Sequence, residues 1–313
     1  MRIIYMGTPE FAVASLAALG EAGYPPVAVV TTPDKPAGRG QQVQRSPVGR
    51  YAEAQGWPLL QPEKLRASDF LAALRALEPD LMVVVAFRML PEVVWRIPRL
   101  GTFNLHASLL PDYRGAAPIN WAVINGESRS GVTTFMIDKE IDTGQILLQR
   151  ETLIPPTWSA GDLHDALMVS GAGLVVETVQ GLEAGRLVPQ PQQEAAFRHA
   201  APKIFREHCL IQWTQPALAV HNHIRGMSPY PAAWTLLDGK VMKVLASRLT
   251  ETPADQPPGT LRVENRQLQV ACADTWLELD QIQVEGKKRM PADEFLRGYK
   301  GPLTQVETPE GPF

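Results

Sequence analysis

The sequence predicts an α/β protein in which a larger domain with a mainly parallel sheet is followed by a smaller β domain. The length of 313 residues exceeds one ordinary domain and favours two. The first half alternates short apolar runs with helical patterns, which is typical of βαβ units. From about residue 209 the pattern changes to short strand-like runs separated by polar turns. The composition, 45% hydrophobic and 20% charged, is that of an ordinary globular protein with a sizeable core.

Strands and helices of the larger domain follow from apolar spacing. The run at 81–87 is apolar on both faces, as expected for a central strand covered by helices on each side. Ser46 followed by Pro47 supplies a helix N-cap and a proline at the first helical position. The predicted strands span 3–6, 27–31, 81–87 and 102–106. The predicted helices lie at 10–19, 47–55 and 68–77.

Two further strand-like runs, 131–138 and 146–154, flank a turn that contains Asp142-Thr143-Gly144. A helix over 159–183, with Ser159 as its cap, closes the larger domain. Residues 185–208 are then rich in Pro, Gln and Ala, which indicates a linker. The predicted organisation is therefore a larger domain at 1–187, a linker at 188–208 and a second domain at 209–313.

The second domain begins with a short helical stretch that runs through Asn222. Five β-like runs with polar turns follow, and this number and spacing favour a small OB-like β-barrel. The predicted strands span 233–237, 241–246, 260–263, 268–271 and 277–284.

Several function classes lack support in the sequence. The two cysteines, Cys209 and Cys272, are far apart and suit neither a disulfide framework nor a metal site. No HExxH, paired CxxC or Walker motif occurs, and the first strand is followed by Gly7-Thr8-Pro9, without the glycines of a dinucleotide-binding turn. We therefore expect no metal. No signal peptide and no membrane-length apolar segment is evident, so we expect a cytoplasmic protein without a membrane partner. No exposed apolar stripe is evident either, so we expect a monomer without a protein partner.

Asn104 and His106 are the first candidates for chemistry. Positions two apart in a strand point to the same face, so an amide and an imidazole lie side by side. They end a parallel strand, where open α/β sheets place their ligand crevice, and an irregular loop at 108–118 follows. Asp142, in a loop after another strand, could orient the imidazole or accept a proton. Taken singly, the histidine suits a hydrogen-bonded polar corner better than a catalytic role, and the aspartate suits a turn better.

A second candidate site is the loop at 33–47, which combines Gly and Pro with the cations Lys35, Arg39 and Arg45. Such a loop could grip phosphates, or it could be a solvated surface loop. The net charge of −3 and the pI of about 6.1 do not indicate a general nucleic-acid binder, so any such contact must depend on local patches.

Five sequence motifs together resemble the methionyl-tRNA formyltransferase family, over nearly the whole chain. Those that resemble all folate-dependent formyltransferases are Asn104-Leu105-His106 and Asp142-Thr143-Gly144. The loop from Lys35 to Gly40 and the barrel-like tail resemble the tRNA enzymes more particularly. The Asn104 motif continues through Ser108 to Pro111, and the remaining resemblance lies in Gly7 to Phe11 and Arg114 to Pro118.

The resemblance implies a Rossmann-like formyltransferase domain, an OB-like second domain, and transfer of a formyl group from 10-formyltetrahydrofolate to the α-amine of methionine on initiator tRNA. It implies that Asn104, His106 and Asp142 are catalytic. A tetrahedral oxyanion needs hydrogen-bond donors, which Asn104 and His106 could supply. The implied folate site comprises Ser108, Leu109, Leu110, Pro111, Phe87, Met89 and Ile141. The implied tRNA contacts are Lys35, Arg39 and Arg45.

Two other functions remain open on the sequence. A nucleotide-sugar N-formyltransferase would share the donor site and differ in its acceptor, although the cationic loop favours tRNA. A non-catalytic tRNA-binding or folate-binding protein would keep the site residues without turnover. Replacing His106 distinguishes the latter from an enzyme, because a pure binder should lose little affinity.

Overall fold

The computed structural model describes residues 1–37 and 42–307, and its contacts divide the chain into two compact units. Unit 1 comprises residues 1–115, 129–153 and 164–200, and unit 2 comprises 116–128, 154–163 and the chain from 201 onward. Each unit is thus assembled from segments that are distant in the sequence. The domain boundaries predicted at 187/188 and 208/209 stay predictions.

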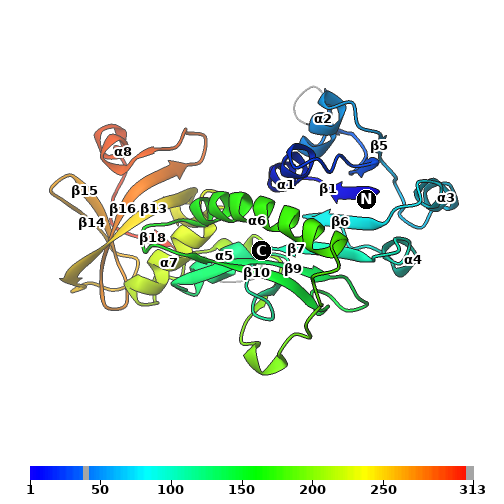
Figure 1. Cartoon of the computed structure of the whole chain (residues 1–313). Helices are drawn as coiled ribbons and strands as arrows, with labels where there is room; N and C mark the ends of the chain where they lie inside the picture. The colour runs from blue at the N-terminus through cyan, green and yellow to red at the C-terminus, as the bar shows by residue number, and fades with distance from the viewer. Residues whose placement is uncertain (38–41, 308–313) are drawn as a thin grey trace. The chain divides into compact units, whose positions relative to one another are not determined.

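A seven-stranded sheet forms the centre of unit 1 (Figure 1). Five strands run parallel, and two antiparallel strands complete the sheet beside the last of them. This arrangement confirms the mainly parallel α/β fold. In spatial order the parallel strands are β5 (Leu59–Leu60), β2 (Ala28–Val30), β1 (Ile3–Gly7), β6 (Leu81–Val85) and β7 (Thr102–His106). The antiparallel strands are β9 (Arg129–Met136) and β10 (Ile146–Leu153).

Helices cover this sheet, and its central strands are accordingly buried along their whole length. The Ser46 side chain accepts a hydrogen bond from Gly49 N–H at 3.0 Å, which confirms the predicted cap. The last helix contacts the sheet through Thr178, whose hydroxyl is 2.8 Å from that of Thr134. The helices are α1 (Glu10–Glu21), α2 (Pro47–Ala54), α3 (Ser68–Ala76), α4 (Glu92–Trp95) and α6 (Ala160–Glu183).

Some predicted loops contain short elements. The cationic loop includes two paired strands, β3 (Lys35–Ala37) and β4 (Gln42–Gln44). The strand predicted to end at residue 87 ends at Val85, because Ala86 adopts a left-handed φ of 46° that a β ladder does not accommodate. The loop at 108–118 and the predicted linker contain β8 (Arg114–Gly115), η1 (Glu194–Ala196), β11 (Ala200–Ala201) and η2 (Glu207–Cys209).

Unit 2 contains an antiparallel sheet that curls, as predicted for a small barrel-like domain. Backbone hydrogen bonds from Leu261 N–H to Thr304 O and from Val306 N–H to Gly259 O, both 2.9 Å, join the two ends of the sheet. Register shifts in the long strand β13 supply the bending. The strands are β12 (Ala233–Leu237), β13 (Lys240–Pro253), β14 (Leu261–Glu264), β15 (Gln267–Ala271), β16 (Thr275–Val284), β17 (Met290–Pro291) and β18 (Val306–Glu307). The helices are α5 (Pro118–Ile124), α7 (Ala217–Met227) and α8 (Ala292–Gly298).

The two cysteines lie in the core of unit 2 and form no disulfide with each other. Burial raises the pKa of Cys272 to about 12, and burial also raises the pKa of Cys209. Both are therefore poor nucleophiles at neutral pH and serve as packing residues. Within the described parts of the chain, no helix combines the length and hydropathy needed to cross a membrane.

Two histidines on α7 predict acid sensitivity of unit 2. Burial lowers the pKa of His221, and it also lowers that of His223. Below the unfolded-state pKa of about 6.5 the unfolded chain binds protons more readily, so the free energy of unfolding should fall as pH drops through this value. Chemical denaturation between pH 7.5 and 5 measures this. The H223L variant should make the free energy of unfolding depend less on pH, whereas H164N, at a half-exposed position on α6, should leave that dependence unchanged.

Candidate active site

The carboxyl end of β7 brings together the three residues predicted to carry the chemistry. Asn104 and His106 lie on this strand, and Asp142 lies in the loop between β9 and β10. The Nδ1 atom of His106 is 3.7 Å from a carboxylate oxygen of Asp142. The two side chains are 7% and 13% exposed, so little water competes for this contact. The tertiary structure therefore places the imidazole and the carboxylate as a pair.

The other nitrogen of His106 fixes the orientation of the ring. Nε2 lies 2.9 Å from the backbone carbonyl oxygen of Tyr113, which can only accept a hydrogen bond. Nε2 therefore carries a hydrogen, and Nδ1 is the nitrogen that faces Asp142. The ring is also packed edge-on against Phe135 at a centroid distance of 6.5 Å.

Asp142 is held in an uncommon backbone conformation. Its φ is 57°, in the left-handed region that aspartate tolerates better than most residues. Its carboxylate accepts a hydrogen bond from Gly115 N–H at 2.9 Å. Two residues later, a Cβ on Gly144 would lie only 1.7 Å from the Met136 carbonyl oxygen. The Asp-Thr-Gly motif thus needs glycine because the loop passes directly over β9.

Asn104 presents a polar group without a partner. Among the described residues its side-chain oxygen is buried and has no hydrogen-bond partner. A buried unpaired amide oxygen is costly, and such groups often mark the place where a ligand binds. The oxygen end of the Asn104 amide is therefore a candidate contact for a ligand.

The predicted folate-site residues fall into two groups. Ser108 and Leu110 are buried, and their backbone is tied to Thr133, whose hydroxyl donates to Ser108 O at 2.7 Å and accepts from Leu110 N–H at 3.1 Å. Leu109 is half-buried and Pro111 is buried. Met89 and Ile141 are exposed by 72% and 59%, and Phe87 is half-buried after β6. The register of β6 on β7 brings the Phe87 loop toward the His106 end of the sheet.

Of the three cations predicted to contact tRNA, Arg45 already has two acidic partners. Its Nε is 3.3 Å from Asp34, and its guanidinium also contacts Glu53. The hydrogen bond to Glu53 is the main cause that raises the pKa of Arg45 further. Lys35 begins β3, and Arg39 lies outside the described residues.

Two residues of the site carry no recognisable signal in the sequence. Gln192, within the predicted linker, donates to the carbonyl oxygens of Asp142 and Gly144, each at 2.8 Å. Tyr113 provides the acceptor for His106 through its backbone, which any residue type carries. Neither role depends on a motif that could be read without the tertiary structure.

Comparisons with known proteins identify the family of the chain. Residues 1–179 match the formyl transferase family, and residues 203–300 match the formyl transferase C-terminal domain. The methionyl-tRNA formyltransferases of Parabacteroides distasonis ATCC 8503 and Bacteroides fragilis ATCC 25285 are 53% and 50% identical, over 96% of this chain and 96% and 95% of theirs. HypX from Aquifex aeolicus in complex with tetrahydrofolic acid shares the fold at 18% identity and a TM-score of 0.65. That alignment covers 97% of this chain, which spans only 50% of the HypX chain.

Proposed function

Because the chain belongs to the methionyl-tRNA formyltransferase family and formylates initiator methionyl-tRNA for translation initiation, we propose that Asn104, His106 and Asp142 carry out this reaction with 10-formyltetrahydrofolate as the donor. The observation that supports this assignment is the convergence, at the end of β7, of an amide whose oxygen has no partner among the described residues, an imidazole and a carboxylate. We also propose that the enzyme acts as a cytoplasmic monomer and needs no metal.

In the proposed reaction the neutral α-amine of methionine attacks the formyl carbon. The new C–N bond forms, the bond from that carbon to N10 of the folate breaks, the amine loses a proton and N10 gains one. The negative charge that develops on the formyl oxygen needs hydrogen-bond donors, and the amide of Asn104 can supply one. The Nε2–H of His106 donates to the Tyr113 carbonyl oxygen in this structure and would have to exchange that partner for the formyl oxygen to supply a second. Asp142 faces the Nδ1 atom of His106 and is the nearby carboxylate that can relay the amine's proton.

The donor would lie against the Ser108–Pro111 segment. Its backbone is fixed to β9 through Thr133, and a rigid backbone is a good template for the polar edge of a pterin. The exposed side chains of Met89 and Ile141 offer apolar surface that a bound ring system would cover.

Single-turnover formylation tests the assignment. Purified protein, 10-formyltetrahydrofolate and a chelator are mixed either with methionyl initiator tRNA or with a nucleotide amino-sugar. We expect rapid transfer to the tRNA and none to the sugar. Transfer to the sugar alone would support the proposed catalytic residues but show that the acceptor is not tRNA. Transfer that occurs only without the chelator would contradict the proposal that no metal is needed.

The cations of the 33–47 loop supply a separate prediction. Changing Lys35, Arg39 and Arg45 together to glutamine should weaken tRNA binding and reduce the slope of log affinity against log salt, by roughly 0.7 to 0.9 for each phosphate that the loop no longer neutralises. Exposed Lys64, Arg66 and Arg75, changed in the same way, form the control. Equal salt slopes for the two triple variants would show that the 33–47 loop does not contact the tRNA.

A further inference from the structure

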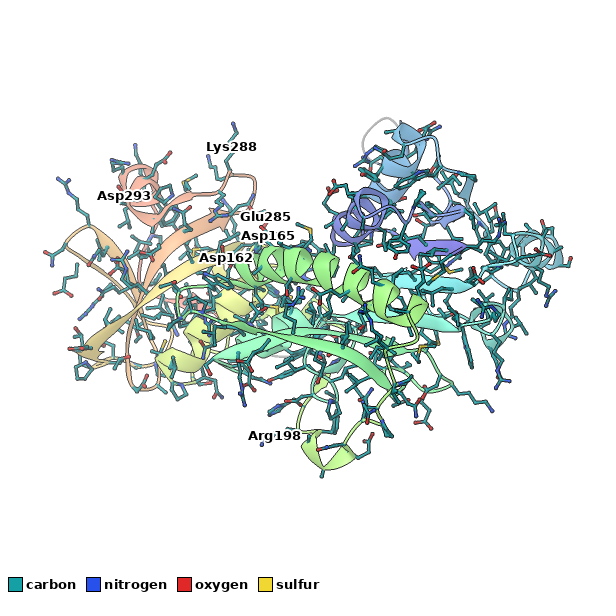
Figure 2. The ribbon with its side chains drawn as sticks, viewed as in Figure 1. Asp162, Asp165, Arg198, Glu285, Lys288 and Asp293 are labelled. Atoms are coloured by element: carbon teal, nitrogen blue, oxygen red, sulfur yellow. The ribbon has the colours of Figure 1, made fainter. Side chains whose placement is uncertain are left out.

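The segment from Gln190 to His199 runs beside the candidate site in unit 1. At its start, Gln190 and Ile146 exchange both backbone hydrogen bonds, each 2.8 Å, which attaches the segment to the beginning of β10. Its composition predicts a linker, and Arg198 marks its far end in Figure 2. Its contacts nevertheless reach both halves of the catalytic pair.

The first set of contacts holds the Asp142 loop. The Gln192 amide donates to Asp142 O and to Gly144 O, each at 2.8 Å, so a single side chain spans the Asp-Thr-Gly turn. Its own oxygen accepts from Arg114 Nε at 3.1 Å and Nη2 at 2.7 Å. Arg114 also forms an ion pair with Glu194 at 2.6 Å. The Gln192 amide is therefore fixed at both ends.

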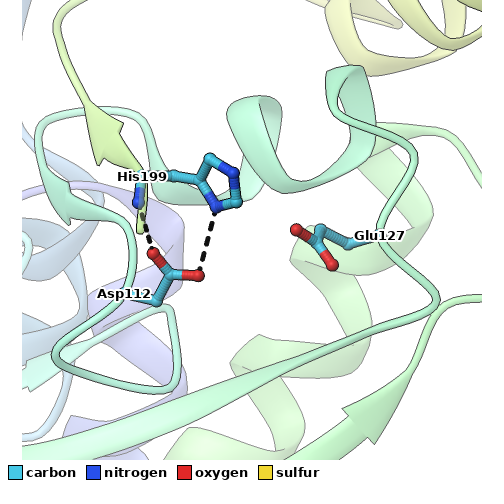
Figure 3. Close-up of side chains that lie close together, drawn as sticks. All are labelled: Asp112, Glu127 and His199. Atoms are coloured by element: carbon cyan, nitrogen blue, oxygen red, sulfur yellow. Dashed lines mark hydrogen bonds and ion pairs between the residues drawn. The ribbon is translucent and has the colours of Figure 1, made fainter. Parts of the chain in front are cut away.

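The second set of contacts holds the backbone of Tyr113, whose carbonyl oxygen accepts the hydrogen bond from His106. Asp112 Oδ1 accepts from the backbone N–H groups of Arg198 and His199 at 3.1 and 2.6 Å, and Asp112 Oδ2 is 3.3 Å from His199 Nδ1 (Figure 3). The adjacent Tyr113 donates its N–H to His199 O at 2.8 Å. The rings of Tyr113 and His199 stack at 5.2 Å.

Tyr113 needs this support because its φ is 58°, in the left-handed region. In this conformation the Tyr113 carbonyl oxygen lies 2.9 Å from Nε2 of His106. If Tyr113 relaxed, His106 would lose the hydrogen bond that sets its ring orientation.

We propose that Gln192 and His199 are positioning residues, which hold Asp142 and His106 in the relative position that formyl transfer requires. This inference rests on the proposed roles of Asp142 and His106. Neither positioning residue touches the reacting atoms. They act through the Asp142 loop and the Tyr113 carbonyl.

Two substitutions each remove the polar side-chain contacts of one positioning residue. Q192L keeps the approximate size of the side chain and loses the amide, and H199F keeps the aromatic ring and loses the hydrogen bond to Asp112. Each should lower the single-turnover rate about tenfold or more, because small displacements of catalytic groups are costly. The KM values for the donor and for the tRNA should stay within about twofold. H199N keeps a donor near the position of Nδ1 and should recover part of the rate. Q193L, at an exposed neighbouring position, is the matched control.

A double-mutant cycle separates positioning from general stabilisation. On an H106A background, H199F should cause no further loss, because the ring that it positions is absent. Q192L on a D142N background should behave in the same way. Additive losses in either cycle, or unchanged rates for Q192L and H199F in the wild type, would overturn the inference. If H106A itself keeps full activity, the proposed catalytic role of His106 is wrong. That result is distinct from the results above, which contradict only the positioning role of Gln192 and His199.

Discussion

The H106A variant should formylate methionyl initiator tRNA about 10²-fold to 10³-fold more slowly than the wild type in single turnover. The variant loses both the Nε2–H that would turn from the Tyr113 carbonyl to the developing oxyanion and the pairing with Asp142, and the expected magnitude is that of losing one oxyanion donor. The dissociation constants for tRNA and donor should change little, because the side chain is only 7% exposed and presents little contact surface. Quench-flow measurement at saturating substrate gives the rate directly.

H164A is the matched control for this variant, since His164 is 39% exposed on α6 and pairs with Asp165. It should retain the wild-type rate. N104A is a second test: its single-turnover rate should fall about 10²-fold, because one oxyanion donor is removed. A loss below about fivefold in H106A, with folding intact, would show that the imidazole takes no part in the chemistry.

The G144A variant should lose nearly all activity, although it adds only one methyl group. The new Cβ would be 1.7 Å from the Met136 carbonyl oxygen, so the backbone must move. Gly144 O is one of the two carbonyls that Gln192 holds, and the displacement would carry Asp142 with it. We expect a loss in rate of about 10²-fold or more from the misplaced carboxylate. The free energy of unfolding should fall by about 1–3 kcal/mol from overpacking.

Chemical denaturation and single-turnover rates, measured on the same preparation, separate these two effects. G298A is the control, because a Cβ at that position on α8 meets no described atom within 4 Å. It should leave both quantities unchanged. If G144A remained fully active, the close passage of the loop over β9 could not be what fixes Asp142.

Much of the fold follows from local sequence. The strand at 102–106 has the predicted bounds, and the apolar run from Leu81 forms the predicted central strand. The Ser46 cap formed as expected because capping depends on neighbours in the chain. The family was also predicted from motifs, and the sequence matches confirm it.

Other features could not be predicted because they depend on long-range contacts. The short strands β3 and β4 pair within a segment whose composition indicates only a loop. The closure of the second sheet depends on hydrogen bonds between residues near 260 and near 305. The two compact units also combine distant segments, so no single boundary in the sequence describes them.

The order of the longer strands and helices, the family and the residue types available for chemistry all follow from the sequence alone. Asn104 and His106 share a face because alternate residues of a strand always do. The folded chain was needed to show that Nδ1 of His106 faces Asp142 while Nε2 meets the Tyr113 carbonyl. Folding also turns a proline-rich and glutamine-rich segment into a contact surface for the site, through Gln192 and His199. These contacts escape sequence reasoning because they use backbone carbonyls and N–H groups, which nearly every residue carries and whose positions depend on the whole fold.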